Sequence, residues 1–469
     1  MVYSLDITYT AAELSRIVSG TLSGNGDLTL CAVSTDSRDK NPGGIFIALR
    51  GEKVDGHDFA AVAAENGAVC VIAERVTEGV LCTRILVKST VEALGALAAD
   101  YKKRIAPKTV AVTGSVGKTT TKQMLSALLS QKWNTHATEK NLNNEIGVPF
   151  TLFGLGCGTR AAVLELGMSG FGEISYLSKM CRPDVGIVTN IGSSHLEHLG
   201  TREGIRDAKL EIRDGIAEGG ALFLCGEEPL LLGVPNAFYV ARAGREIAAK
   251  PDVLVKNYAE YDSGCIFDIE AFGKELRAVA LPAFGEHNAY NAALAAGAGI
   301  FLGLTEDEIL RGFENFTNAP LRQATGIYSG IRVIEDCYNA APESVMSAIE
   351  VLCGYRRREG GCIVAVLGDM RELGGESEKL HERVGAAAAH AGIDMLFTFG
   401  NDAKSIAEGA KKEGMQAEKI HSFCDLSDAA ALAEAVAEVA LGGDTVLFKA
   451  SRAVEMERVS GLFIDSKKN

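Results

Sequence analysis

The chain lacks the features that mark a secreted or membrane-spanning protein. Its eleven cysteines lie scattered from Cys31 to Cys424 without a Cys-x-x-Cys pair, so we interpret them as reduced core thiols, not a disulfide framework or metal site. Residues 1–12 show no basic segment followed by an apolar one, the pattern of a secretory signal. The most apolar run, Ala289 to Leu304, is shorter than the roughly 20 residues of a membrane span, and we expect a buried helix there. We therefore expect a cytoplasmic protein without a membrane partner.

Positive charge is also scarce. The 47 Lys and Arg residues face 61 Asp and Glu residues, which leaves a formal net charge of −14. This charge repels nucleic acid and anionic membrane surfaces, so we expect no nucleic-acid partner, and an anionic ligand must bind in a locally basic pocket. Hydrophobic residues make up 47% of the chain and glycine is abundant, with 52 residues, as is typical of α/β proteins. A length of 469 residues predicts several domains, and we expect three.

The most informative segment is TVAVTGSVGKTTT, Thr109 to Thr121. Its β-branched run predicts a buried strand, Gly114 and Gly117 predict a turn, and a helix is expected from Thr120 to Leu129. Such a turn directs backbone N–H groups and a helix N-terminus to one place, where a phosphate can bind.

This segment departs from the full Walker pattern, because Val112 stands where that pattern has glycine. We interpret Gly114–Thr119 as a shortened phosphate loop, in which Lys118 reaches the outer phosphates and the Thr119 hydroxyl binds Mg²⁺. Taken alone, the same residues are compatible with a tight turn and a solvated lysine.

Strand and helix patterns divide the chain into three predicted units. Residues 1–88 form a small N-terminal α/β domain, residues 89–319 a central phosphate-loop ATPase domain with a doubly wound sheet, and residues 320–469 a C-terminal Rossmann-like domain. Strands and helices alternate in the central unit to about Leu304, and the pattern restarts after a predicted hinge at Asn318-Ala319-Pro320.

Ligands of doubly wound sheets bind beyond the carboxyl ends of the strands, and several such ends here carry polar residues. Glu165 closes the apolar run AAVLEL, where an unpaired charge is costly, so we expect a cation beside it. His195 follows the strand DVGIVTN, although a lone loop histidine is more often structural and His198 could serve equally well. Lys209, in the helical run RDAKLEI, by itself indicates only a surface charge.

The outer units carry polar clusters of their own. The N-terminal segment STDSR, Ser34 to Arg38, suits a sugar or phosphate ligand, although a turn with a solvated arginine is the simpler interpretation. Polar and glycine residues also gather at the predicted strand ends of the C-terminal unit: Asp336, Tyr338, Asn339, Gly368, Asp369, Lys449, Ser451 and Arg452.

Taken in order, these motifs resemble the Mur ligases, the ATP-dependent amide-forming enzymes of peptidoglycan precursor synthesis. The resemblance covers essentially the whole chain and is carried by TGSVGKTT, NLNNEIGVP, LELG with Glu165, NIGSSHLEHLG with His195, DAKLEI with Lys209, GEHNAYN and Arg322. Within the family, five segments resemble the member that adds D-alanyl-D-alanine to UDP-N-acetylmuramoyl-tripeptide: STDSR, PGGIFIALRGEKVDGHDF, EDCYNAAPES, LGDMRELG and VLFKASRAVEME.

The resemblance implies transfer of the ATP γ-phosphoryl group to the tripeptide carboxylate, followed by attack of the dipeptide amine on the acyl phosphate. It implies ATP and two Mg²⁺ sites, the first held by Thr119 and Glu165 and the second by His195 and Lys209. Lys209 is expected as a carbamate formed with CO₂, because an anionic oxygen suits a hard cation that an ammonium group would repel. A plain lysine that pairs with the phosphates is the alternative.

The resemblance also assigns residues by role. The implied catalytic residues are Lys118, Glu165, His195 and Lys209. The implied nucleotide contacts are Gly114, Ser115, Val116, Gly117, Lys118, Thr119, Thr120, His287, Asn288, Asn291, Arg322 and Asp336. The implied substrate contacts are Ser37, Arg38, Asn143, Asn144, Asn339, Lys449, Ser451 and Arg452. Because one chain supplies all the residues that bind ATP, metal and substrates, we expect a monomer whose third domain closes on ATP and substrate.

Two departures and several alternatives stay open. Lys140 stands where the family usually has glycine, and Ala324 where a glutamate is often expected. The alternatives are a folylpolyglutamate synthase, the ligase that adds the third amino acid, and a regulatory phosphate-loop NTPase, although no NKxD-like guanine motif is present. Whether the third peptide residue is lysine or diaminopimelate is left undecided.

Overall fold

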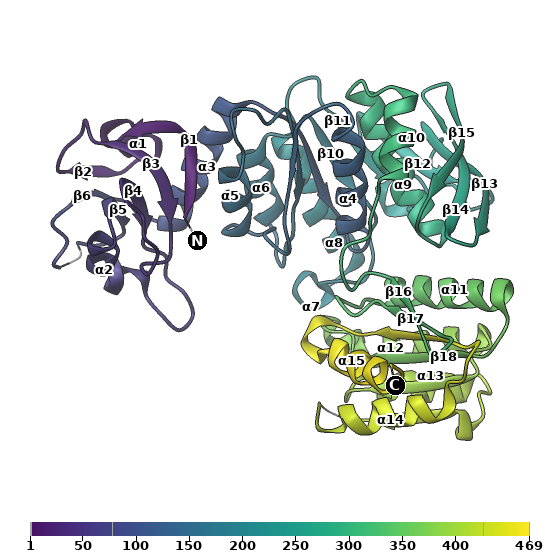
Figure 1. Cartoon of the computed structure of the whole chain (residues 1–469). Coiled ribbons are helices and arrows are strands. Elements are labelled where there is room, and N and C mark those ends of the chain that lie inside the picture. The colour runs from purple at the N-terminus through teal and green to yellow at the C-terminus, as the bar shows by residue number, and fades with distance from the viewer. Residues whose placement is uncertain (1, 77, 425, 469) are drawn as a thin grey trace.

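The computed structural model describes residues 2–76, 78–424 and 426–468. Three β-sheets follow one another along the chain, each with helices of its own (Figure 1), which confirms the predicted α/β class and the three units. The unit limits 1–88, 89–319 and 320–469 remain our proposal. No helix in the described part of the chain is long and apolar enough to cross a membrane.

The N-terminal unit is a six-stranded sheet in the order β1-β3-β4-β5-β6-β2. The strands β3 to β6 run parallel, and β1 and β2 pair antiparallel at the two edges. Its elements are β1 (Tyr3–Thr10), α1 (Ala11–Ile17), β2 (Thr21–Ser23), β3 (Thr29–Ser34), β4 (Gly44–Ile47), α2 (Ala60–Glu65), β5 (Ala68–Ala73) and β6 (Thr83–Leu86).

The central unit is a nine-stranded sheet in the order β15-β14-β13-β12-β11-β10-β7-β9-β8. Its strands are β7 (Lys108–Thr113), β8 (Thr135–Ala137), β9 (Ala161–Glu165), β10 (Val185–Val188), β11 (Ala221–Cys225), β12 (Ala237–Arg242), β13 (Val253–Tyr261), β14 (Gly264–Ala271) and β15 (Lys274–Leu281). Its helices are α3 (Thr90–Ile105), α4 (Lys118–Leu129), α5 (Gly147–Phe153), α6 (Glu173–Cys181), α7 (Leu196–Leu199), α8 (Arg202–Leu210), α9 (Glu286–Phe301) and α10 (Glu306–Glu314).

The central sheet differs from the predicted alternation of strands and helices in one region. From β13 to β15 the chain forms an antiparallel meander without intervening helices. Its strands alternate between buried and exposed residues, because only one face is covered. From β7 to β11 strands and helices alternate as predicted, whereas β11, β12 and β13 run parallel without an α-helix between them. β7 lies between β10 and β9, so the ends of these three strands lie side by side.

The C-terminal unit is a six-stranded sheet in the order β16-β17-β21-β18-β19-β20, with only β16 antiparallel to its neighbour. Its strands are β16 (Ala324–Tyr328), β17 (Ile331–Glu335), β18 (Ile363–Gly368), β19 (Met395–Phe399), β20 (Ile420–Phe423) and β21 (Thr445–Lys449). Its helices are α11 (Pro342–Glu359), α12 (Ser377–His390), α13 (Lys404–Lys412), α14 (Ala429–Val439) and α15 (Met456–Ser466).

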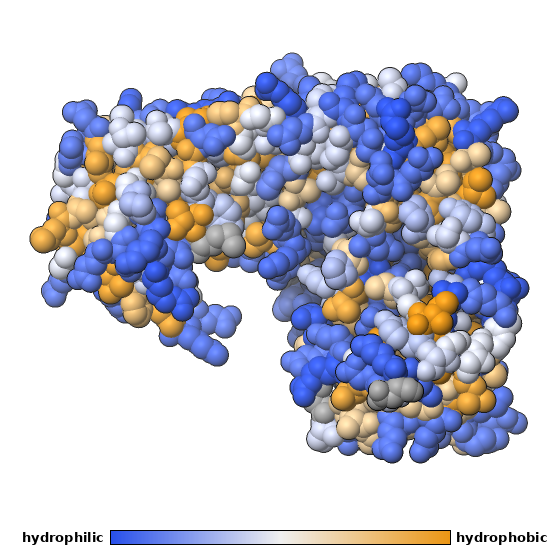
Figure 2. Space-filling model, viewed as in Figure 1, coloured by the Kyte–Doolittle hydropathy of each residue, from blue (hydrophilic) through white to orange (hydrophobic). Residues whose placement is uncertain are grey.

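The three units form an angle, with the N-terminal and C-terminal units at the two ends of the central one (Figure 1). The space-filling view shows a deep re-entrant gap between the two outer units (Figure 2). One prediction about the cysteines was wrong in part. All eleven are free, as expected, but Cys31, Cys157, Cys362 and Cys424 are exposed, so they are not core thiols.

Candidate active site

The turn after β7 has the backbone that its glycines predict. Gly114 has a φ of +149°, and a Cβ there would lie 1.8 Å from Thr189 Oγ1. Gly117 has a φ of +83° and precedes the first residue of α4. Larger residues would be strained or would clash at these positions, so the loop requires glycine where the motif has it. Helix α4 begins at this turn, and the unpaired N–H groups at its N-terminus favour an anion there.

The neighbouring strand β10 holds this loop in place. The Thr189 hydroxyl donates to Val116 O at 2.6 Å, and Val116 N donates to Asn190 Oδ1 at 3.0 Å. Lys118 Nζ donates to Gly114 O at 2.6 Å and to Ser115 O at 3.2 Å, so the lysine folds back over its own loop. Burial lowers the pKa of Lys118. A phosphate in the loop would offer this ammonium group a stronger partner than a carbonyl does.

Glu165, at the end of β9, is surrounded by polar groups although only 4% of its surface is exposed. The Thr119 hydroxyl donates to Glu165 Oε2 at 2.9 Å, and Asn143 Nδ2 donates to Oε1 at 3.1 Å. The expected cation is Lys122, whose Nζ lies 3.8 Å from Glu165 Oε2 and donates to Thr138 O at 2.6 Å. Lys122 was missed in the sequence, although a lysine on the apolar side of the helix after the loop is a usable signal.

The donors around Glu165 fit a hard cation only in part. A carboxylate and a hydroxyl 2.9 Å apart are oxygen ligands of the kind Mg²⁺ prefers. However, no group of three His, Cys, Asp or Glu side chains capable of holding a metal is found in the described ranges. This agrees with the usual Mg²⁺ site, in which one or two carboxylates share the ion with substrate phosphates.

Lys209 is not a surface charge. It lies in the last turn of α8 with 1% of its surface exposed, and its Nζ makes no hydrogen bond that involves the described residues. Burial, and secondly the charge of Lys118, hold its pKa well below the usual lysine value. A lowered pKa increases the neutral fraction of the amine, and the neutral form is the one that reacts with an electrophile such as CO₂.

His195 lies between the central and C-terminal units. Its Nδ1 lies 2.5 Å from Glu372 Oε2, a carboxylate of the C-terminal unit that sequence reasoning missed. The histidine holds the pKa of the Glu372 carboxyl below its usual value. His198, the alternative named from sequence, lies within α7 and lines no part of the pocket described next.

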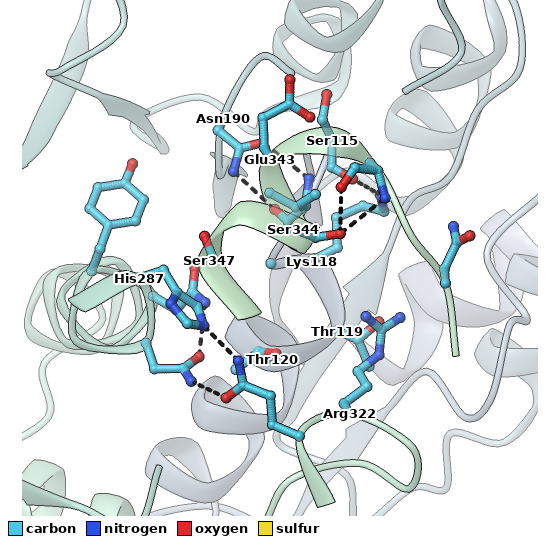
Figure 3. Close-up of a pocket in the computed structure, with 18 of the residues that line it drawn as sticks. Ser115, Lys118, Thr119, Thr120, Asn190, His287, Arg322, Glu343, Ser344 and Ser347 are labelled. Carbon is cyan, nitrogen blue, oxygen red and sulfur yellow. Dashed lines mark hydrogen bonds between the residues drawn. The ribbon is translucent and has the colours of Figure 1, made fainter. Parts of the chain in front are cut away.

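A cavity of about 270 Å³ lies between the carboxyl ends of the central and C-terminal sheets (Figure 3). Thirteen residues named from the sequence line it: Ser115, Val116, Gly117, Lys118, Thr119, Thr120, His287, Asn288, Asn291, Arg322, Asp336, Asn339 and Lys449. It also includes residues that sequence reasoning passed over, among them Asn190, Arg242, Tyr290, Gln323, Glu343, Ser344 and Ser347.

One end of this pocket is built from amides at the start of α9. Asn288 Nδ2 donates to Phe284 O at 2.8 Å and to Gln323 Oε1 at 3.2 Å. Gln323 Nε2 lies 3.0 Å from His287 Nε2, and burial lowers the pKa of His287 to about 4, so the ring is neutral and accepts this hydrogen bond. Within the described ranges His287 Nδ1 has no partner. These amide and imidazole groups both donate and accept, which suits the edge of a base.

The opposite wall comes from the C-terminal unit. Lys449 Nζ donates to Asp336 Oδ2 at 2.6 Å and to Asn339 O at 3.1 Å. Lys449 is the last residue of β21, and Asp336 directly follows β17. The Arg322 guanidinium carbon lies 4.4 Å from the centre of the Tyr338 ring. The Ser193 hydroxyl of the central unit donates to Glu343 Oε1 of α11 at 2.8 Å, across the boundary between the units.

Several residues named from the sequence do not line this pocket. Arg38 pairs with Asp36 in the N-terminal unit and its side chain is 86% exposed, and Ser37 lies beside it. Asn144 Oδ1 accepts a hydrogen bond from Gly147 N, and Ser451 Oγ donates to Ala340 O. The remaining ones outside the pocket are Gly114, Asn143, Glu165, His195, Lys209 and Arg452; Arg452 pairs with Glu457 and is 61% exposed.

Comparisons with family models match three successive parts of the chain. Residues 30–102 match the Mur ligase family catalytic domain, residues 112–299 the Mur ligase middle domain, and residues 322–452 the Mur ligase glutamate ligase domain.

Individual proteins are similar over nearly the full length. The chain is 36% identical to the UDP-N-acetylmuramoyl-tripeptide–D-alanyl-D-alanine ligase of Bacillus subtilis (strain 168), over 98% of this chain and 99% of that protein. A crystal structure of MurF from Acinetobacter baumannii superposes with a TM-score of 0.89 at 30% identity, covering 98% of this chain and 99% of that one. MurF ligase from Thermotoga maritima in complex with ADP superposes with a TM-score of 0.83 at 32% identity, covering 93% and 97%.

Proposed function

Because the chain belongs to the Mur ligase family, we propose that it is the ATP-dependent ligase that joins D-alanyl-D-alanine to UDP-N-acetylmuramoyl-tripeptide in cytoplasmic peptidoglycan precursor synthesis. The observation that carries the proposal is the pocket in which the phosphate loop of the central unit faces the Asp336–Lys449 pair of the C-terminal unit. Similarity to ligases of this specificity over 98% of the chain supports the choice of substrates.

In the first step, a carboxylate oxygen of the tripeptide attacks the γ-phosphorus of ATP, and ADP leaves. This transfer depends on positioning and charge neutralisation, because little acid or base chemistry is needed. The loop from Gly114 to Thr119 holds the phosphates, and Lys118 turns from its own carbonyls to the γ-phosphate. His287, Asn288 and Asn291 hold the adenine, Asp336 the ribose side and Arg322 the phosphates from the hinge.

In the second step, the dipeptide amine attacks the acyl carbon, loses a proton, and phosphate leaves with the former carboxylate oxygen. Phosphorylation makes this possible because phosphate is a far better leaving group than oxide. Asn339, Lys449, Ser451 and Arg452 hold the substrates from the C-terminal unit. Ser37 and Arg38 hold the UDP part in the N-terminal unit, with Asn143 and Asn144 between them and the pocket.

Two magnesium ions would be held by the protein donors named below together with oxygens of the bound phosphates. Thr119 and Glu165 would hold the first, and His195 with Lys209 as a carbamate would hold the second. When bound, Mg²⁺ neutralises the charges that gather around the transferred phosphoryl group. The carbamate is supported by burial of the Lys209 amine and by its lowered pKa, since only a neutral amine reacts with CO₂. All ligands are held by one chain, and we propose a monomer.

The proposal is tested by phosphate release in an omission series. Purified protein with ATP and Mg²⁺ should release phosphate only when both UDP-N-acetylmuramoyl-tripeptide and D-alanyl-D-alanine are present, and tripeptide precursors with lysine or diaminopimelate identify the third residue. Lys118→Met should abolish release. The matched control is Lys108→Met, at the exposed start of β7, the strand that leads into the loop, and this variant should retain release. Release that ignores both substrates would instead identify a phosphate-loop NTPase without ligase activity.

A further inference from the structure

Two loops from different units meet beside the pocket, one after β10 and one after β18. Besides the contact between Glu372 Oε2 and His195 Nδ1, Glu197 N donates to Glu372 O at 3.2 Å. The loops also fit closely, because a Cβ at Gly374 would lie 3.0 Å from Glu197 Cα. In Figure 1 the short helix α7 that follows His195 reaches down to the C-terminal unit. A charge pair, a backbone hydrogen bond and close packing therefore hold the two loops together at one place.

Both residues of this contact have unusual backbones. His195 has a φ of +65° and Glu372 a φ of +64°, the left-handed region that residues other than glycine seldom adopt. Such conformations are strained and persist where the surroundings impose them, often at functional sites. Here two of them face each other across a boundary between units, and each presents its side chain to the other.

The contact engages the imidazole through one nitrogen. Nδ1 lies 2.5 Å from Glu372 Oε2 as a charge pair, and within the described ranges it has no partner with hydrogen-bond geometry. Histidines that bind metals commonly have a carboxylate beside one ring nitrogen and offer the other nitrogen to the ion. The holding group here does not belong to the unit that carries His195, Glu165 and Lys209.

We propose that Glu372 is a positioning residue for His195, so that docking of the C-terminal unit completes the second cation site. The inference rests on the proposed function, in which His195 holds Mg²⁺. It adds a residue to that site and makes its completion depend on the position of the third unit. A separate contact, Ser193 with Glu343, can dock the units without touching the imidazole, so loss of Glu372 need not separate them.

The test uses the full chain with Glu372→Gln, which keeps the size of the side chain, and Glu372→Gly, which also relieves the positive φ and so favours folding. The matched control is Glu376→Gln, an exposed carboxylate of the same segment that pairs with Lys379 at 3.1 Å. The first readout is the ¹³Cε1 signal of His195 in the unliganded, histidine-labelled protein, assigned among the eight histidines with His195→Gln. The second is steady-state kinetics with varied ATP and Mg²⁺.

We expect both Glu372 variants to shift the His195 signal and to lower kcat by about 10-fold or more, with KM for ATP nearly unchanged, since the adenine end of the pocket is untouched. Glu376→Gln should match the wild type in both readouts. An unshifted signal with wild-type kcat overturns the proposal, as does lost stability with an unshifted signal, which would make the contact merely structural.

The variants distinguish the metal role of His195 from the positioning role of Glu372. If His195→Gln retains full ligase activity, the proposed metal role of His195 fails, whatever the Glu372 variants do. If His195→Gln is inactive and the Glu372 variants behave as the control does, only the positioning role fails.

Discussion

The central unit meets its two neighbours through junctions of opposite character. At the N-terminal junction the apolar cores are continuous: a single buried cluster includes residues of both units. Tyr3 stacks on Phe150 with ring centres 5.1 Å apart, and Asp6 N donates to the buried Tyr101 hydroxyl at 3.1 Å. Separation of these units would expose a shared core, so this junction is expected to stay closed.

The junction with the C-terminal unit is mostly polar, although Phe284 of the central unit packs against the C-terminal core, with its ring centre 4.9 Å from that of Tyr355. That unit has core clusters of its own on the two faces of its sheet, separate from the shared cluster. Its contacts with the central unit include Ser193 with Glu343, His195 with Glu372, and Arg358 with Glu260. Arg358 also lies over the Phe284 ring, 4.3 Å from its centre.

This difference indicates which side of the active site moves. Polar groups that separate can form hydrogen bonds with water in exchange, whereas an apolar core loses about 25 cal/mol for every Å² that it exposes. The phosphate loop, Glu165 and Lys209 therefore belong to a fixed block with the N-terminal unit, and the C-terminal unit brings the remaining groups to it.

The largest effect is expected from Lys209→Ala, which removes a buried group of the fixed block. We expect ligase turnover to fall about 100- to 1,000-fold, as when one preorganised electrostatic partner is lost, with partial recovery on addition of small carboxylates. The control is Lys179→Ala, an exposed lysine whose Nζ lies 3.7 Å from Asp214 Oδ2. Unchanged turnover in Lys209→Ala would exclude the proposed metal role.

The next effect concerns stability at the apolar junction. Tyr101→Ala should lower the free energy of unfolding of the fixed block by about 3–5 kcal/mol, because it leaves a large cavity in the shared core. Tyr101→Phe should lower it by about 1–2 kcal/mol, through loss of the hydrogen bonds to Leu155 O and from Asp6 N. Urea titrations measure both. If Tyr261→Ala, at a partly exposed position, costs as much as Tyr101→Ala, the junction has no special role.

A third prediction concerns closure. Small-angle scattering should show a smaller radius of gyration with a non-hydrolysable ATP analogue and UDP-N-acetylmuramoyl-tripeptide than without ligands, because the pocket walls come from two units. The rate of limited proteolysis between the N-terminal and central units should be the same with and without these ligands. Absence of compaction would contradict closure of the C-terminal unit.

The smallest effect is expected from Arg358→Met, which weakens the polar junction alone. The free energy of unfolding should fall by about 1–3 kcal/mol, because the Arg358–Glu260 pair is largely buried, while the unliganded radius of gyration increases. Arg356→Met is the control, since Arg356 lies on the same helix but binds Gly392 O within its own unit. Equal behaviour of the two variants would show that Arg358 does not help to hold the units together.

The sequence predicts those parts of the fold that local patterns encode. Glycines with positive φ mark the phosphate loop, and apolar runs mark the parallel strands on either side of it. The family's usual glycine at position 140 also has a local explanation. Lys140 has a φ of +48°, a backbone conformation that glycine adopts more readily than lysine. The antiparallel strands β13 to β15 were missed because alternation with helices was assumed to continue.

Contacts between units could not be predicted in the same way. Glu372 and Glu343 are unremarkable in their own segments, and their partners His195 and Ser193 belong to another sheet. Lys122 illustrates an intermediate case: a cation beside Glu165 was expected from the cost of burying a charge, but the pattern did not say which residue supplies it.

Formation of an acyl phosphate by this chain can be followed with tripeptide precursor labelled with ¹⁸O in its terminal carboxylate. Because a carboxylate oxygen attacks phosphorus and later leaves with it, we expect one ¹⁸O atom in the released phosphate for every amide bond formed. Amide formation that leaves the phosphate free of ¹⁸O would contradict it.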